Sequence, residues 1–475
     1  MRSWKASAAV FGSSAAVLVL EIIAGRLMAP YVGISLETFT GIIGTMLAGI
    51  AVGAGLGGWL ADHREPRPLL GPLLVAGGAL TWLSLPIVTT LGPGVGEGPV
   101  AIVVLTTAAF FGPAVVLSAI SPIIAKIRLA RLDETGTVVG GLSAAGTIGA
   151  LAGTFLTGFV LVATLTSRAI VLGVGAILVL VGVAVWVRLG RRPDVPTVAV
   201  VLAMGFMGAS SPSQCQLETS YFCVRIVDDP KLATGRTLYL DTLRHAYVDL
   251  DDPTNLGLRY VRLLADVADG LPDGPLDAVH IGGGGFSFPR YVEATRPAST
   301  NEVLEIDGDL VGLAEDELGL VRSDTLRVTV SDARLALDDR PTDSADLVVG
   351  DAFGSQSVPW HLTTAEVVTE IDRILRPGGV YAMNVIDGAD SDFARAQLAT
   401  LADRFAHVAV ILPRGGVPGH RAVNQILLAS SAPLPELAIA PADGELVEGP
   451  AVDRYIGDAE VLTDERAPAD LLVFR

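Results

Sequence analysis

Residues 277–307 read DAVHIGGGGFSFPRYVEATRPASTNEVLEID, and this stretch decides the fold of the C-terminal half of the chain. A short apolar strand (278–281) runs directly into four glycines (282–285); a helix-compatible segment follows, and a second strand (302–306) carries Glu305. Glycine suits such a turn because the backbone can bend sharply and a ligand can approach it without meeting a Cβ atom. Glu305 lies about 20 residues after the turn, where a carboxylate can hold ribose hydroxyls. Although a glycine run alone is usually only a loop, the whole pattern predicts a site for an adenosine-type ligand.

Around this stretch the sequence predicts strands that alternate with helices. Residues 218–226 and 237–250 have the alternation of two strands in a hairpin, and 258–268 have the pattern of a helix. Further strands are expected at 326–330, 345–349, 380–385, 407–412 and 423–429, and a further helix at 363–375, ended by Pro377, Gly378 and Gly379. This alternation favours a mostly parallel, doubly wound sheet that binds ligands at the carboxyl ends of its strands. Four acids follow such strand ends: Glu305, Asp307, Asp332 and Asp351.

The N-terminal half has a different composition. The mean hydropathy of the chain is +0.53, which is high for a soluble protein. Residues 1–210 hold 12 Lys and Arg against 8 Asp and Glu, and the rest of the chain holds 21 against 43, so a net charge of +4 precedes one of −22. Because the C-terminal half carries so much negative charge, nucleic acid is not expected as its partner. This half would suit a small polycation such as a polyamine, although a solvated acidic surface explains the same charge.

Six apolar runs reach the roughly 20 residues that a membrane-spanning helix needs; they cover 7–25, 39–61, 69–91, 99–125, 138–163 and 168–187. A seventh run, 195–209, is only marginally long enough. The basic residues fall mainly on one side of these runs: Arg2, Lys5, Arg64, Arg67, Lys126, Arg128, Arg131, Arg188, Arg191 and Arg192, against Arg26 and Arg168 on the other. The positive-inside rule then predicts a multi-pass protein of the cell membrane, in contact with the lipid bilayer, with its N-terminus in the cytoplasm. Glycines spaced by four residues (49, 53 and 57; 149 and 153) predict closely packed helices.

The two cysteines, Cys215 and Cys223, follow the seventh run closely. A pair at this spacing could form a disulfide, which would indicate an oxidising compartment. Seven spans would also place the C-terminal half outside the cytoplasm, whereas six would leave it inside, where adenosylated cofactors are made. We expect the outside location, and the other remains open.

The soluble half resembles spermidine synthase and related aminopropyltransferases, and the whole chain resembles bacterial proteins that fuse a major-facilitator-like membrane module to such a domain. The resemblance is carried by IGGGG (281–285), VLEID (303–307), SDARLALD (331–338), VVGDAF (348–353), HLTT (361–364), LRPGG (375–379) and LTDERAP (462–468). It implies a class I methyltransferase (Rossmann-like) fold behind a small N-terminal β-hairpin, decarboxylated S-adenosylmethionine as co-substrate, a polyamine or other small cation as acceptor, and a homodimer as a plausible assembly.

The resemblance also implies roles for individual residues. Gly282 and Gly284 would approach the cofactor, Glu305 would bind its ribose, and Asp332 with Ala333 would contact the adenine. Asp307 would also belong to the cofactor-binding residues. Asp351 would lie beside the reacting sulfonium and the amine as the catalytic residue. Asp241 and His245 would form part of the polyamine pocket.

Two acids of the family pattern are replaced here, one in the glycine turn by Gly285 and one in its paired-acid motif by Gly354. A second hypothesis therefore stays open beside a membrane-anchored aminopropyltransferase: a catalytically silent nucleoside- or polyamine-binding sensor fused to a half-transporter. The six histidines lack metal-ligand spacing, so no metal is expected. We expect a transmembrane domain at 1–211, a linker with the hairpin at 212–272, and the Rossmann-type domain at 273–475.

Overall fold

The computed structural model describes residues 3–96, 98–129, 135–354, 358–388, 390–414 and 423–473. The chain divides into two compact units, Met1–Cys223 and Val224–Arg475. Two of the basic residues used above to orient the chain, Arg2 and Arg131, lie outside the described residues.

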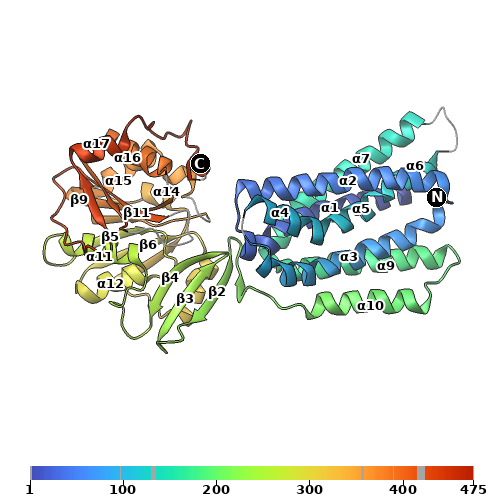
Figure 1. Cartoon of the computed structure of the whole chain (residues 1–475), viewed down its shortest axis with the longest axis horizontal. Coiled ribbons are helices and arrows are strands. Elements are labelled where there is room, and N and C mark those ends of the chain that lie inside the picture. Colours follow the sequence, from blue (N-terminus) through green and yellow to red (C-terminus); the bar gives the residue numbers. More distant parts are fainter. Residues whose placement is uncertain are drawn as a thin grey trace. The chain divides into compact units, whose positions relative to one another are not determined.

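The first unit is a bundle of helices (Figure 1). Within the described part of the chain, six helices are long and apolar enough to cross a membrane: Trp4–Val32, Leu36–His63, Arg67–Gly94, Pro99–Arg128, Thr135–Thr164 and Ser167–Arg188. They correspond to α1 (Ser3–Val32), α2 (Leu36–His63), α3 (Leu70–Leu91) with its flanking turns, α4 to α6 (Pro99–Thr106, Gly112–Ser118, Ile120–Arg128), α7 with α8 (Thr135–Leu156, Val162–Thr164) and α9 (Ser167–Arg188). The helices long enough to span the membrane therefore match the six apolar runs expected from the sequence.

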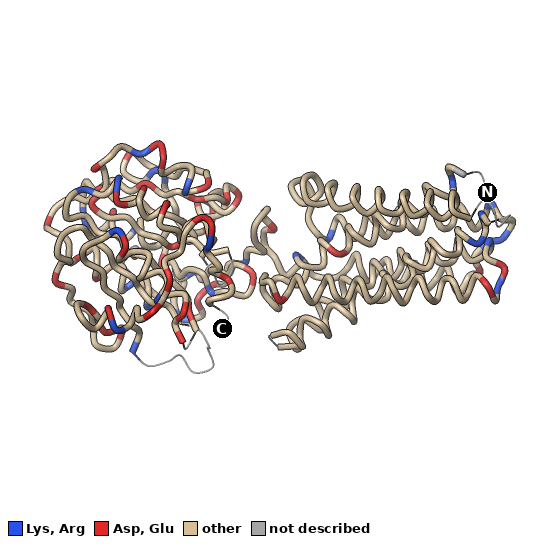
Figure 2. The backbone as a smooth tube through the Cα atoms, turned by 90° about the horizontal axis from the view of Figure 1, so that it is seen from above, with Lys and Arg blue, Asp and Glu red and all other residues tan. Residues whose placement is uncertain are grey.

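Small residues bring these helices together, as their spacing predicted. A Cβ atom at Gly53 or Gly57 of α2 would meet the backbone of α5 and of the residue that follows it, and one at Gly149 or Gly153 of α7 would meet the backbone of α1. Charged residues are rare along the middle of the bundle, and Figure 2 shows most of its basic residues at the end where the N-terminus lies.

The seventh apolar run forms α10 (Val195–Ser210), which is shorter than the other six. The preceding helix α9 runs antiparallel to α3, because Gly175 faces Gly78 and Gly182 faces Gly71. Helix α10 runs back along α3 with its glycines against Trp82. It ends where the Arg168 side chain donates a hydrogen bond to the Ala209 carbonyl. Because Arg168 is in the first turn of α9, α10 returns the chain to the end of the bundle at which α9 begins.

A group that we call the exit clasp holds the chain after α10. Glu218, in the short strand β1 (Leu217–Glu218), accepts hydrogen bonds from the backbone amide (2.8 Å) and the hydroxyl of Ser167, at the start of α9. Its carboxylate also lies 3.7 Å from the Arg26 guanidinium of α1. A disulfide between Cys215 and Cys223 closes the loop that contains Glu218, which confirms the pairing that the spacing allowed.

The second unit begins with strands β2 (Cys223–Asp228), β3 (Gly235–Leu240) and β4 (Leu243–Asp249), which pair antiparallel. The expected single strand at 237–250 is wrong, because the chain turns at Asp241, whose φ of 53° is left-handed, and the two halves pair with each other. The alternation of side chains continues across this tight turn, so the sequence pattern does not show it.

An eight-stranded mixed sheet follows, with the order β12-β10-β11-β9-β8-β5-β6-β7. Its strands are β5 (Asp277–Ile281), β6 (Thr300–Glu305), β7 (Leu326–Val330), β8 (Ala345–Gly350), β9 (Leu375–Asp387), β10 (His407–Leu412), β11 (Val423–Ser430) and β12 (Glu445–Glu448). The five strands from β7 to β9 are parallel, whereas β11, β10 and β12 pair antiparallel beyond β9. The expectation of a mostly parallel sheet therefore holds only for its first five strands.

Helices cover both faces of this sheet (Figure 1). Buried apolar side chains of α11 (Arg259–Gly270) and α12 (Ser287–Thr295) form one core with the sheet. Those of α14 (Ala333–Asp338), α15 (Ala365–Ile374), α16 (Asp392–Arg404), α17 (Pro450–Ile456) and α18 (Ala469–Val473) form another. Helix α13 (Gly308–Glu317) follows β6. One boundary differs from expectation: β9 starts at Leu375 and passes through Pro377, because the ladder with β8 shifts register there and leaves the proline unpaired.

Candidate functional site

The mixed sheet has a topological switch point at β5. From β5 the chain proceeds through β6 to β7 on one side, while β8 and β9 lie on the other. The loops that leave β5 and β8 therefore run toward opposite faces and leave a crevice at their carboxyl ends, which is where open α/β sheets bind ligands.

The glycine turn after β5 needs glycine at several positions. Gly282 has φ +95°, and a Cβ atom there would collide with the Asp351 carbonyl. Gly284 has φ +51°, and a Cβ atom there would come within 2.7 Å of the His245 ring. Phe286, the residue before α12, is fully buried against Gly283 and Val303 and is not among the residues that line the crevice. The crevice is thus open at the turn.

Glu305 holds the turn from the neighbouring strand. Its Oε2 accepts hydrogen bonds from the amides of Gly283 (2.8 Å) and Gly284 (3.3 Å), and its Oε1 accepts one from Asp307 (2.9 Å). Burial raises the pKa of Glu305, while these backbone donors oppose the rise. The carboxylate predicted to bind a ribose therefore also determines the shape of the loop that would face the cofactor.

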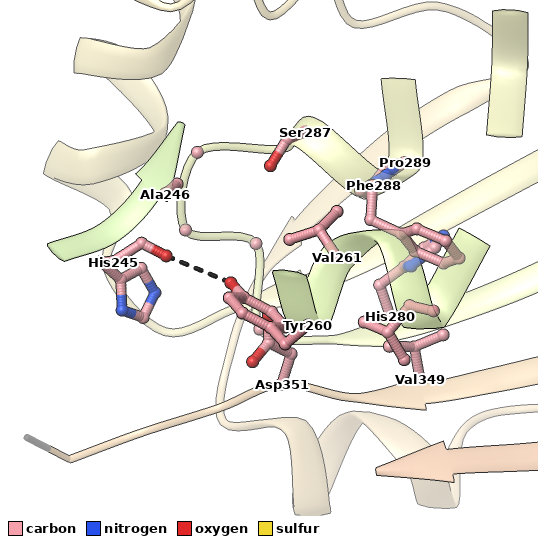
Figure 3. Close-up of a pocket in the computed structure, with 15 residues that line it drawn as sticks. His245, Ala246, Tyr260, Val261, His280, Ser287, Phe288, Pro289, Val349 and Asp351 are labelled. Atoms are coloured by element: carbon pink, nitrogen blue, oxygen red, sulfur yellow. Dashed lines mark hydrogen bonds between the residues drawn. The ribbon is translucent and has the colours of Figure 1, made fainter. Parts of the chain in front are cut away.

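A pocket lies between this turn, β4 and α11 (Figure 3). Its lining comes from β4 (His245, Ala246), α11 (Tyr260, Val261, Leu264), β5 and its turn (His280, Gly282, Gly283, Gly284, Gly285), α12 (Ser287, Phe288, Pro289) and the end of β8 (Val349, Asp351). Four residues expected from the sequence are thus brought together: Gly282, Gly284, His245 and Asp351. Among the described residues that line the pocket, Asp351 is the only acid.

Asp351 sits in a network of hydrogen bonds. Its Oδ1 accepts a hydrogen bond of 2.8 Å from Asn384 of β9, whose own oxygen accepts one of 3.0 Å from Asn424 of β11. The Tyr260 hydroxyl lies beside the Asp351 carboxylate and donates to the His245 carbonyl at 3.1 Å (Figure 3). Burial raises the pKa of Asp351 to about 6, while the hydrogen bond from Asn384 and the neighbouring Tyr260 hydroxyl oppose the rise. A carboxyl group with this pKa can exchange protons near neutral pH.

The two histidines of the pocket are both held neutral. Burial lowers the pKa of His245 to about 4, and burial likewise lowers that of His280 to about 4. His280 belongs to β5, and its Nε2 lies 2.9 Å from Asn301 Oδ1 on β6. Neither ring adds a positive charge to the pocket.

The remaining predicted residues lie outside this pocket lining. Asp307 is buried and caps α13, accepting hydrogen bonds from the amides of Asp309 and Leu310. Asp332 caps α14 through the Arg334 amide and lies 3.3 Å from His361 Nε2, with Ala333 buried beside it. Asp241 is buried in the turn between β3 and β4. Asp307 and Asp332 thus each cap a helix, a role that their positions in the sequence do not reveal.

The sequence interpretation did not single out Tyr260, His280 or Asn384. Tyr260 lies on the apolar face of an expected helix, and Asn384 lies inside a buried strand. A polar residue inside an otherwise apolar strand, such as His280 or Asn384, was the available signal, because buried polar groups need partners. Within the described ranges, no group of three or more His, Cys, Asp or Glu side chains could hold a metal ion.

Known proteins resemble the C-terminal part of this chain. No family model matches the chain. Its sequence is 26% identical to the polyamine aminopropyltransferase of Vibrio vulnificus over 208 residues, which are 40% of this chain and 68% of that protein. It is 27% identical to the enzyme of the same name from Chromobacterium violaceum over 152 residues, which are 31% of this chain and 57% of that protein.

Among solved structures, a probable spermidine synthase from Corynebacterium glutamicum aligns with a TM-score of 0.50 and 25% identity, covering 53% of this chain and 97% of that one. The C-terminal part of the chain is therefore homologous to spermidine synthases and related aminopropyltransferases. The fold expected from the resemblance is supported for this part.

Proposed function

We propose that the C-terminal unit binds decarboxylated S-adenosylmethionine, or a closely related adenosyl ligand, and transfers its aminopropyl group to an amine. We further propose that the helical unit anchors this domain in a membrane. The homology to polyamine aminopropyltransferases and to a probable spermidine synthase supports the general activity.

The observation that carries this proposal is the position of Asp351. Its carboxylate lines the pocket at the switch point, next to the glycine turn on which the cofactor would lie. In the reaction, the lone pair of an amine nitrogen forms a bond to the carbon next to the sulfonium. The carbon–sulfur bond breaks, its electron pair stays on sulfur to give a neutral thioether, and the nitrogen releases a proton. Asp351 would hold the amine in line and accept that proton.

The residues around the turn would bind the nucleoside. Gly282 and Gly284 let the ligand approach the backbone, and the carboxylate of Glu305 would accept hydrogen bonds from ribose hydroxyls while it keeps the turn in shape. Asp332 and Ala333 would face the adenine at the end of β7, and Asp307, two residues after Glu305, would belong to the cofactor site at the end of β6. His245 of β4 and Asp241, in the turn between β3 and β4, would cover the amine.

A silent ligand-binding domain is the second candidate, and Gly285 and Gly354 favour it. At Gly285, a Cβ atom would lie 2.5 Å from the Ala246 Cβ atom, so β4 leaves no space for an acidic side chain in the turn. Gly354 is exposed and offers no carboxylate beside Asp351. A single acid must then position the amine and accept its proton, unless no transfer takes place.

Calorimetry on the full-length protein, with decarboxylated S-adenosylmethionine and with methylthioadenosine, separates the candidates. The aminopropyltransferase hypothesis expects both ligands to bind, and expects the first to be consumed when an amine is added. Binding without turnover would favour the sensor, and absence of binding would remove both. The Asp351→Asn variant is the matched control, because it should keep nucleoside binding and lose transfer.

We also propose that the N-terminus faces the cytoplasm and that the C-terminal unit faces the opposite side. Three observations support this orientation: the basic residues at one end of the helical unit, the return of the chain along α10, and the disulfide at Cys215 and Cys223. A disulfide of this kind persists in oxidising compartments.

A further inference from the structure

The inner end of the pocket holds a hydrogen-bond acceptor that the protein does not use. His280 is only 2% exposed, and its Nε2 faces Asn301 Oδ1 at 2.9 Å. Because an amide oxygen can only accept, His280 carries its proton on Nε2, and its Nδ1 is an acceptor. Within the described part of the chain, no hydrogen-bond partner reaches this buried Nδ1. An unused buried acceptor is costly, so it points to a group that arrives from outside the chain.

His280 lies on the same face of the sheet as the reacting end of the pocket. It pairs in register with Val349 of β8, and Asp351 follows Val349 by two residues, so the side chains of His280 and Asp351 point the same way. Strand spacing and rise separate their Cα atoms by about 8 Å. Both residues line one pocket (Figure 3). One short molecule can therefore contact both His280 and Asp351.

Asn301 is a polar neighbour of His280, whereas the pocket-lining side chains of Phe288, Leu264 and Val349 are apolar. The Phe288 ring meets the imidazole edge-on at a centroid distance of 5.6 Å, and Leu264 and Val349 are almost fully buried. Among the described residues that line the pocket, Asp351 is the only acid, and it lies at the other end of the pocket. An ammonium group at the inner end would be buried without a counter-ion, whereas a hydroxyl or amide N–H would need only one acceptor.

Resting on the proposed transferase function, we infer that the acceptor is an amine whose far end is an uncharged hydrogen-bond donor, which His280 Nδ1 accepts. The preferred substrate class is thus a short amino alcohol or amino amide, and not a diamine. The lowered pKa of His280 is consistent with this role, because the ring stays neutral and accepting at physiological pH. His280 acts here as a specificity residue and takes no part in the transfer of the proton.

Three amines of matched length test the inference on the full-length protein: 4-amino-1-butanol, 1,4-diaminobutane and pentylamine. We expect the amino alcohol to bind roughly five- to tenfold more tightly than pentylamine, as one added neutral hydrogen bond implies, and more tightly than the diamine. Equal binding of the three amines, no binding of any, or a preference for the diamine would each overturn the inference. Equal binding would mean that water serves Nδ1.

Two variants at the same position make the test specific. His280→Leu should remove the preference for the amino alcohol over pentylamine, whereas His280→Asn, which keeps an acceptor near the Nδ1 position, should retain it. If both variants lose the preference for the amino alcohol, or if neither variant loses it, the role of Nδ1 is contradicted. His407→Gln, on strand β10 outside the pocket, is the control, and thermal unfolding of each variant shows whether it is folded.

Titrations with and without methylthioadenosine separate this inference from the proposed function. The nucleoside alone reports the cofactor site, and the order of the three amines reports His280. If the nucleoside binds but the affinities for the three amines do not follow the expected order, only the inference about His280 is overturned. Amine selectivity without nucleoside binding would leave the contact of His280 with the amine standing, but would overturn the proposed transfer reaction.

Discussion

The Glu305 carboxylate accepts a 2.8 Å hydrogen bond from the backbone amide of Gly283, so the acid at the end of β6 determines the shape of the turn at the end of β5. The same oxygen also reaches the Gly284 amide at 3.3 Å. One side chain thus joins two strands at the position where the cofactor is expected.

Glu305→Gln should weaken nucleoside binding at least tenfold. The glutamine keeps one acceptor oxygen, but its amide nitrogen replaces an oxygen that faces a backbone donor, so one buried N–H loses its partner. We expect the free energy of unfolding to fall by about 1–3 kcal/mol as well. Calorimetry with methylthioadenosine and thermal unfolding of the full-length protein measure the two effects. Unchanged nucleoside affinity would show that the turn does not need this carboxylate.

Gly285→Ala should destabilise the C-terminal unit by about 1–3 kcal/mol, because the new Cβ atom would lie 2.5 Å from Ala246 and force β4 away. The double variant Gly285→Ala with Ala246→Gly should recover part of that loss. Gly312→Ala on α13 is the control, since a Cβ atom there meets nothing within 4 Å and a helix favours alanine by about 1 kcal/mol. Additive effects of the two changes would contradict the steric explanation.

Asp351→Asn should abolish transfer and yet stabilise the fold at neutral pH. Burial raises the Asp351 pKa from 3.8 to about 6, so its contribution to folding is fully present below pH 4 and is lost as the pH rises through about 6. Above that pH the folded protein carries a buried charge that asparagine avoids. We expect the variant to be more stable by on the order of 1–2 kcal/mol at pH 7.5.

The same comparison at pH 4 should show no difference in stability, because aspartic acid is then protonated in the folded protein. Unfolding midpoints of the full-length protein at the two pH values measure this. A variant that is less stable at both values would mean that the Asp351 charge is favourable where it lies.

Cys215 and Cys223 should resist an impermeant thiol reagent applied to intact cells, and should react once an impermeant reductant has been added outside. The disulfide blocks both thiols, and the proposed orientation exposes them to the outer medium. Cys223→Ser should label at Cys215 without any reductant, since its partner is absent and Cys215 is only half-buried. Labelling that requires cell lysis would place the C-terminal unit in the cytoplasm, and labelling of the untreated protein would contradict the disulfide.

The sequence predicted elements whose signals are local. Strands β7 and β10 have the expected bounds, and the glycine turn lies where the strand pattern of 277–307 placed it. Features that depend on distant partners were missed: the antiparallel pairing of β9 with β11, and the strand β12. The apolar pattern of a strand does not show whether the neighbouring strand in the sheet runs parallel or antiparallel to it.

In the site, too, residues with a local signal were predicted and residues that depend on distant partners were not. Glu305 and Asp351 were singled out because an acid at the carboxyl end of a strand in such a sheet lies where ligands bind. The network behind Asp351 was not, because Asn384 and Asn424 are separated by 40 residues and meet only when β9 pairs with β11. His280 differs again, since only the unused Nδ1, seen in three dimensions, distinguishes it from any histidine in a strand.

The exit clasp implies an order of assembly during synthesis. Arg26 emerges from the ribosome early, but its partners Glu218 and the Ser220 carbonyl, bound at 3.0 Å, are made nearly two hundred residues later. The Arg26 side chain therefore stays without these partners until the chain beyond α10 has been made. Closure of the clasp marks the point at which α1 to α10 are all present, while most of the second unit is still to be translated.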